Sequence, residues 1–98
     1  MITRIVKLTF KEENIPSFEA IFEETKEHIR NFEGCMFLTL YQDLKAPHIF
    51  FTYSKWQEEM HLENYRNSEF FKQVWSRTKP LFEARAEAWS IQEKVVLN

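Results

Sequence analysis

The chain has 98 residues, which fits one small domain, and we expect residues 1–98 to form it. Its 13 basic and 15 acidic residues give a formal net charge of −2, and no basic block provides the electrostatic footprint of a nucleic-acid binder. Cys35 is the one cysteine, and because neither a signal-peptide core nor a long apolar run is present, the sequence predicts a cytoplasmic protein with no membrane partner.

The first third of the chain predicts a strand followed by a helix. Alternating apolar and polar residues over about 2–10 are typical of a strand. Pro16 then suits a first helical turn, with Asn14 or Ser17 as the cap. Apolar residues continue at helical spacing to Phe32. Gly34 is the only glycine in the chain and follows this pattern, where a left-handed residue ends a helix.

The remainder predicts two strands, a helical region and a last strand. Residues 35–44 and 48–56 are rich in β-branched and aromatic side chains and are joined by a short hairpin loop. Helical spacing returns near residue 57, Ser68 caps a second helical segment, and Pro80 ends or kinks it. The last strand is expected near 86–94. This βαββαβ order predicts a ferredoxin-like α+β fold, with a four-stranded antiparallel sheet and helices on one face.

Both faces of the predicted sheet carry apolar side chains. Alternation in the second strand places one set of residues, Met36, Leu38 and Leu40, opposite a second set, Cys35, Phe37, Thr39 and Tyr41. Two helices cover only one face, and an antiparallel sheet with one face in water normally alternates apolar and polar residues. We therefore expect a second copy to cover the other face, which makes the protein a homodimer.

Several segments resemble the antibiotic biosynthesis monooxygenase (ABM) family along nearly the whole chain. These are "EGCM" (33–36), Trp56 at the end of a strand before an acidic helix start, "YRNSEFF" (65–71) and "EAWSI" (87–91). The family folds as dimeric α+β barrels and includes small oxygenases that act on electron-rich phenols or quinols without metal or flavin. The resemblance thus implies that fold, no cofactor, and a small aromatic or quinol ligand.

The chain departs from the family's pattern in two respects. Many members carry a His in the segment that matches residues 65–71, where this chain has Tyr65, and His61 lies about one helical turn earlier. The haem-degrading branch has an Asn in its first strand and a His ligand on its second long helix. Here the first strand has no Asn and residues 69–84 have no His, which argues against haem degradation.

Aromatic residues are the candidates for a substrate-binding slot. Trp56 would line it because the resemblance places this residue at the family's pocket. Trp75, Phe71 and Thr52 would complete the wall, the first two from one helical stripe. Core packing explains the same aromatic side chains, and both readings stay open at this point.

The polar candidates are Tyr65, His61 and Arg77. Tyr65 would exchange a proton with a phenolic substrate, with His61 or Arg77 as its partner. A tyrosine with its ordinary pKa, near 10, is a poor base at neutral pH. A packed Tyr65 and solvated helix faces for His61 and Arg77 are the structural alternatives. The three histidines are too scattered to predict a metal site.

Two functions remain in competition. A cofactor-independent monooxygenase needs an apolar slot, a hydrogen-bonding group and exclusion of water, because its substrate supplies the electrons to O₂. The alternative is a non-catalytic homodimer that binds a small apolar ligand or serves a stress-related role, and an isomerase or decarboxylase also remains open. An open cleft lined by Trp56 and Tyr65 favours the oxygenase, whereas a filled interior favours the alternative.

Overall fold

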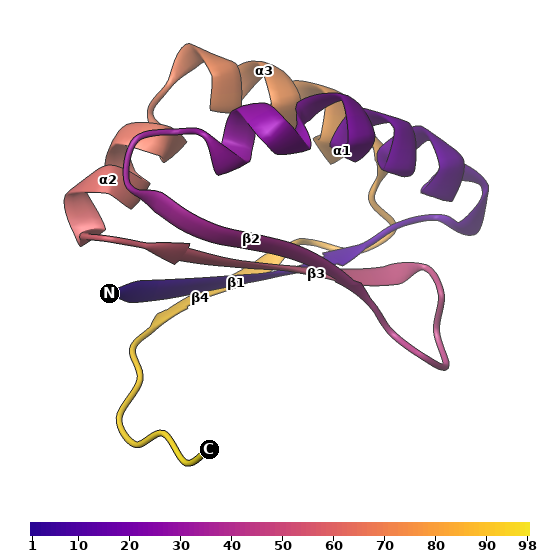
Figure 1. The fold of residues 1–98 in the computed structure, drawn as a ribbon. Helices are drawn as coiled ribbons and strands as arrows, with labels where there is room; N and C mark the ends of the chain where they lie inside the picture. The colour runs from indigo at the N-terminus through magenta and orange to yellow at the C-terminus, as the bar shows by residue number, and fades with distance from the viewer.

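The computed structural model describes residues 1–98, in which one antiparallel sheet carries all the helices on one face (Figure 1). The sheet has the order β2-β3-β1-β4. Its strands are β1 (Ile2–Thr9), β2 (Cys35–Gln42), β3 (Ile49–Trp56) and β4 (Glu87–Ile91). The helices are α1 (Ile15–Arg30), α2 (Glu59–Arg66) and α3 (Glu69–Thr78). This arrangement confirms the predicted ferredoxin-like α+β fold.

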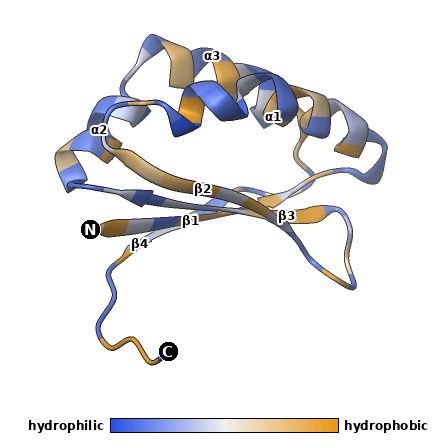
Figure 2. Cartoon of the chain, in the orientation of Figure 1, coloured by the Kyte–Doolittle hydropathy of each residue, from blue (hydrophilic) through white to orange (hydrophobic).

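Two apolar clusters join the sheet to the helices. Leu8, Phe10, Phe18 and Phe50 form the larger one, and the rings of Phe10 and Phe18 stack with centroids 4.3 Å apart. Cys35, Trp56 and Leu62 form the smaller one. The hydropathy colouring shows many hydrophilic residues on the outer surfaces of the helices (Figure 2). Each cluster ties the end of a central strand to a helix.

The start of β2 differs from simple alternation because a bulge interrupts its pairing with β3. Cys35 pairs with Trp56, but Phe37 pairs with Lys55, so Met36 is an extra residue. Cys35 is therefore buried beside Trp56 on the helix side, while Met36 is exposed. The prediction that Cys35 shares a face with Phe37, and Met36 with Leu38 and Leu40, was wrong for this reason.

The predicted helix boundaries are largely confirmed. The hydroxyl of Ser68 caps α3 by accepting a hydrogen bond from the backbone N–H of Phe71 at 3.1 Å. Pro80 lies in a short 3₁₀ turn, Lys79–Leu81, directly after α3. Asn14 precedes α1, but its side chain donates to the carbonyl of Leu81 instead of capping the helix. The last strand ends at Ile91 and is thus shorter than predicted.

The face of the sheet opposite the helices is exposed and largely apolar. Phe37, Tyr41, Trp89 and Ile91 are 41–51% exposed on it. The C-terminal residues after β4 leave the sheet on this same side (Figure 1). None of the helices has both the length and the apolar character required to cross a bilayer.

Gly34 occupies a position that requires glycine for two reasons. Its φ is +86°, and a Cβ at this position would overlap the imidazole of His61. The backbone carbonyl of Gly34 also accepts a hydrogen bond from the N–H of Gln57 at 2.8 Å, which ties the start of β2 to the end of β3. The left-handed conformation is as predicted, although α1 itself ends earlier, at Arg30.

Gly34→Ala should therefore destabilise the fold by roughly 1–2 kcal/mol from backbone strain alone, with a further loss from the clash. Chemical denaturation measures the change. The same substitution in a His61→Gly background separates the two causes, because the Cβ of His61 is itself one of the clashing atoms and only glycine removes it, so that only the strain remains. Equal losses in both backgrounds would mean that the clash contributes nothing.

Candidate functional site

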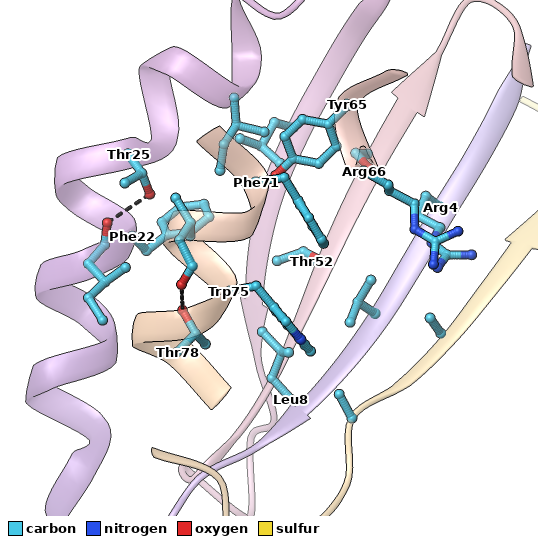
Figure 3. Close-up of a pocket in the computed structure, with 18 of the residues that line it drawn as sticks. Arg4, Leu8, Phe22, Thr25, Thr52, Tyr65, Arg66, Phe71, Trp75 and Thr78 are labelled. Carbon is cyan, nitrogen blue, oxygen red and sulfur yellow. Dashed lines mark hydrogen bonds between the residues drawn. The ribbon is translucent and has the colours of Figure 1, made fainter. Parts of the chain in front are cut away.

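A cavity of about 310 Å³ lies between the sheet and the helices. Of the 21 residues that line it, 15 are hydrophobic. β1 and β3 supply its floor, α1 and α3 its roof, and α2 one end, as the close-up shows (Figure 3). Its size reaches the lower end of the range found for small-molecule sites. The space therefore suits a compact, mostly apolar ligand.

Aromatic side chains form one wall of the cavity. Tyr65 stacks on Trp56 with ring centroids 5.0 Å apart and meets the edge of Phe71 at 5.1 Å. Phe71 and Trp75 are nearly parallel, at 6.0 Å and 9°. The cavity-lining side chains predicted from the sequence, Trp56, Trp75, Phe71 and Thr52, all belong to this lining.

Several polar groups of the lining are already hydrogen-bonded inside the chain. The indole N–H of Trp56 donates to the hydroxyl of Ser54 at 3.0 Å. The hydroxyls of Thr25 and Thr78 each donate to a backbone carbonyl of their own helix at 2.8 Å. Trp56 is also only 1% exposed. It therefore acts as a packed support of the aromatic wall and has no N–H left for a ligand.

Other polar groups of the lining have no hydrogen-bond partner in the chain. Tyr65, Trp75 and Thr52 line the cavity, and their side-chain hydroxyl, indole N–H and hydroxyl make no intramolecular hydrogen bond. These residues belong to α2, α3 and β3. Polar atoms of a bound ligand would satisfy these groups.

Burial strongly affects the acidity of Tyr65. Desolvation, with a smaller contribution from Cys35, raises the pKa of the Tyr65 hydroxyl far above its ordinary value of 10.0. The phenol thus stays protonated across the physiological range. Tyr65 can donate a hydrogen bond to a ligand, but it cannot serve as a general base at neutral pH.

Two arginines form the charged part of the lining. Arg4 of β1 donates a hydrogen bond from Nη1 to the hydroxyl of Ser90 on β4 at 2.9 Å. The side chain of Arg66 extends from the end of α2 toward Arg4, so that the two guanidinium groups lie together (Figure 3). Partial burial and the nearby Arg66 charge lower the pKa of Arg4. No other charged side chain lines the cavity.

His61 and Arg77 lie outside the lining, contrary to the expectation that one of them would partner Tyr65. His61 packs against Gly34, and its Nε2 is 3.9 Å from the carboxylate of Glu33. Arg77 is on the outer surface of α3, where it forms a 2.9 Å ion pair with Glu24 of α1. Helical geometry explains the result for Arg77, because it is two positions beyond Trp75 and points away from the sheet.

Sequence reasoning missed Arg4, Arg66, Ala86 and Ala88. Arg4 shares the inward face of β1 with Val6 and Leu8, so an arginine in an apolar alternation was the available signal. Arg66 follows Tyr65 directly and points about 100° away from it on an ideal helix, but its long side chain reaches the cavity (Figure 3). Ala86 and Ala88 line the cavity with small side chains.

No group of three or more His, Cys, Asp or Glu side chains is arranged to hold a metal ion. Cys35 is buried, and burial raises the pKa of its thiol.

Comparison with known proteins places the chain in a family. Residues 1–76 match the sequence model of the family described as antibiotic biosynthesis monooxygenase. The chain belongs to this family, and the resemblance drawn from the sequence is confirmed. A search of curated proteins found no significant match.

Solved structures share the fold. A conserved protein from Methanosarcina mazei Go1 is 24% identical, with 96% of this chain and 94% of that chain covered and a TM-score of 0.89. A structure described as an antibiotic biosynthesis monooxygenase is 19% identical. It covers 95% of this chain and 98% of its own chain, with a TM-score of 0.89. A protein from Pseudomonas aeruginosa is 20% identical. The match covers 96% of this chain and 94% of that chain, with a TM-score of 0.85. At these identities the likeness concerns the fold alone.

The raised pKa of Tyr65 predicts how stability responds to alkali. Below pH about 10 the phenol is protonated in both the folded and the unfolded chain, so Tyr65 causes no pH dependence there. Above that pH the unfolded chain loses the proton first, and the free energy of unfolding falls as pH rises toward the folded-state pKa. Tyr65→Phe should flatten this fall in the free energy of unfolding measured by chemical denaturation at a series of alkaline pH values. The same dependence of unfolding free energy on pH in the wild type and in Tyr65→Phe would contradict the raised pKa of Tyr65.

Proposed function

We propose that the protein is a cofactor-independent monooxygenase that oxidises a small aromatic or quinol substrate with O₂. The observation that carries the proposal is the apolar cavity of about 310 Å³, whose wall includes both Trp56 and Tyr65. A chain built only to pack would fill this space. Membership of the antibiotic biosynthesis monooxygenase family supports the reaction class.

The reaction balances without an external reductant. A phenol and O₂ give a quinone and water: one oxygen atom forms a C–O bond at a ring carbon, and the other leaves as water. The ring supplies all four electrons, and the water receives the proton of the broken C–H bond and the phenolic proton. Loss of the phenolic proton makes the ring electron-rich enough to react with O₂. The protein's task is therefore to hold the ring, favour its anionic form and exclude bulk water.

In this proposal Tyr65 is a hydrogen-bond donor to the substrate oxygen. Its pKa is raised, so its proton stays in place while charge develops on the substrate oxygen. Trp75 and Phe71 hold the ring from the α3 side, and Thr52 contacts it from the sheet. His61 and Arg77 receive no role at the substrate, because neither lines the cavity.

Oxygen uptake with a panel of reduced quinols and dihydroxyaromatics tests the proposal. Tyr65→Phe should lower kcat/KM on the order of 10²-fold, because one donor to the developing oxyanion is lost. Tyr41→Phe is the matched control and should retain the activity. Trp56→Ala should also abolish uptake, although denaturation curves must accompany it because Trp56 is a core residue.

The alternative is a non-catalytic homodimer that binds a small ligand in the same cavity. Binding of quinols without any protein-dependent oxygen uptake would favour this alternative and contradict the oxygenase. Uptake that is unchanged in Tyr65→Phe would contradict the role given to Tyr65.

We also propose that a second copy of the chain covers the exposed sheet face. Phe37 and Tyr41 both meet Tyr53 edge to face, at 5.9 and 6.2 Å, which forms an aromatic surface without cover in the single chain. Lys55 lies over Phe37 and Tyr53, which neighbour it on this face. Burying such side chains contributes about 1.5–3 kcal/mol each, which is enough to drive association.

Size-exclusion chromatography with light scattering should give twice the mass of one chain at micromolar concentration. Tyr53→Glu should shift this mass toward the monomer, because a carboxylate would be buried against an apolar partner surface. Met60→Glu is the control, since Met60 is 55% exposed on α2, on the helix side of the molecule. A wild-type protein that is monomeric under these conditions would rule out the dimer.

A further inference from the structure

We propose that Arg4 and Arg66 form an anion-binding subsite at the end of the cavity, and that the ligand is an aromatic carboxylate. This inference rests on the proposed function, since it names the class of substrate: a hydroxylated aromatic acid whose ring enters the apolar space while its carboxylate stays at the arginines.

The first support is the pairing state of the two arginines. Other cations of the chain have a carboxylate partner, as in Lys7 with Glu87 and Arg77 with Glu24. Arg4 and Arg66 have no carboxylate within 4.0 Å, and their guanidinium groups lie next to each other (Figure 3). Two like charges side by side repel each other, and an anion between them removes that cost.

The second support is the geometry of the donors. The hydrogen bond from Arg4 to Ser90 fixes its guanidinium at the rim between β1 and β4. Arg4 keeps further N–H donors that have no partner in the chain, and Arg66 makes no intramolecular hydrogen bond from its side chain. Guanidinium groups match the two oxygens of a carboxylate in a fork-like arrangement.

The third support is the division of the cavity. Apart from Arg4 and Arg66, its lining is uncharged and mostly hydrophobic. An amphiphilic ligand with a flat apolar body and a single anionic group fits this division, whereas a neutral hydrocarbon would leave both arginines unpaired. A cationic ligand would be repelled.

Isothermal titration calorimetry with three naphthalene derivatives tests the subsite in anaerobic buffer, without turnover. Naphthoate carries the carboxylate, naphthylmethanol is its neutral counterpart, and naphthylmethylammonium is its cationic counterpart. Wild-type protein should bind naphthoate at least about tenfold more tightly than naphthylmethanol, because charge-assisted hydrogen bonds form only with the carboxylate. Added salt should narrow this difference. The cation should bind most weakly.

Arg66→Gln should weaken naphthoate binding about tenfold and leave naphthylmethanol binding unchanged. Arg66 is exposed, so its replacement should not disturb the core. Arg77→Gln is the matched control, because it removes the same charge from the neighbouring helix outside the cavity, and it should change neither affinity. Should Arg66→Gln fail to fold, the comparison of ligands on the wild-type protein decides the question.

The inference is overturned if naphthoate binds no better than naphthylmethanol, if it fails to bind at millimolar concentration, or if Arg66→Gln weakens both ligands equally. Its failure is distinguishable from failure of the oxygenase proposal. Carboxylate-selective binding without oxygen uptake from any hydroxylated aromatic acid would keep the subsite and reject the oxygenase. Oxygen uptake from neutral quinols, without selective binding of carboxylates, would keep the oxygenase and reject the subsite.

Discussion

The stacking of Tyr65 on Trp56 is the interaction on which the cavity depends. Trp56 is held at the end of β3 by burial and by its hydrogen bond to Ser54, so its ring has a fixed orientation. Tyr65 rests on that ring, with Phe32 against its edge at 5.3 Å. These contacts fix α2 over the end of the sheet. Because Arg66 follows Tyr65 directly, the same stacking also places the guanidinium beside Arg4.

An aromatic-rich protein of this size retains a cavity because its large and small side chains are unevenly distributed. Phe10, Phe18 and Phe50 fill one end of the space between the layers, and Trp56 with Leu62 fills the other. Ala86, directly before β4, and Ala88 of β4 line the cavity, where larger side chains would take up some of its space. The aromatic residues thus form walls, and the alanines determine the open volume.

Most of the fold was predictable, since hydrophobic periodicity and turn residues report local structure directly. The strand alternation, Ser68 and Gly34 each defined a boundary because their chemistry allows few other conformations. The bulge at Met36 was not predictable, because alternation assumes that no residue is added to the pairing. It depends on how β2 meets β3, which is a tertiary contact.

The site was only half predictable for a related reason. Thr52, Phe71 and Trp75 lie on faces that periodicity assigns to the interior, so their place in the lining followed from local structure. Arg66 lies on the outward side of α2, and only the length and direction of its side chain bring it to the cavity. The sequence shows where a residue's Cβ points, but a long flexible side chain can reach a site from a position that points elsewhere.

The electrostatics of the cavity narrow the chemistry that it supports. Its charged groups are two guanidiniums, its phenol stays protonated, and the indole N–H of Trp75 faces the same space. Every one of these groups favours an electron-rich or anionic oxygen on the ligand. In the proposed reaction, such an environment would stabilise the phenolate form of a bound phenol, so deprotonation would need no protein base at the ring. A site that stabilises the product of deprotonation in this way suits a substrate that reacts with O₂ as its anion.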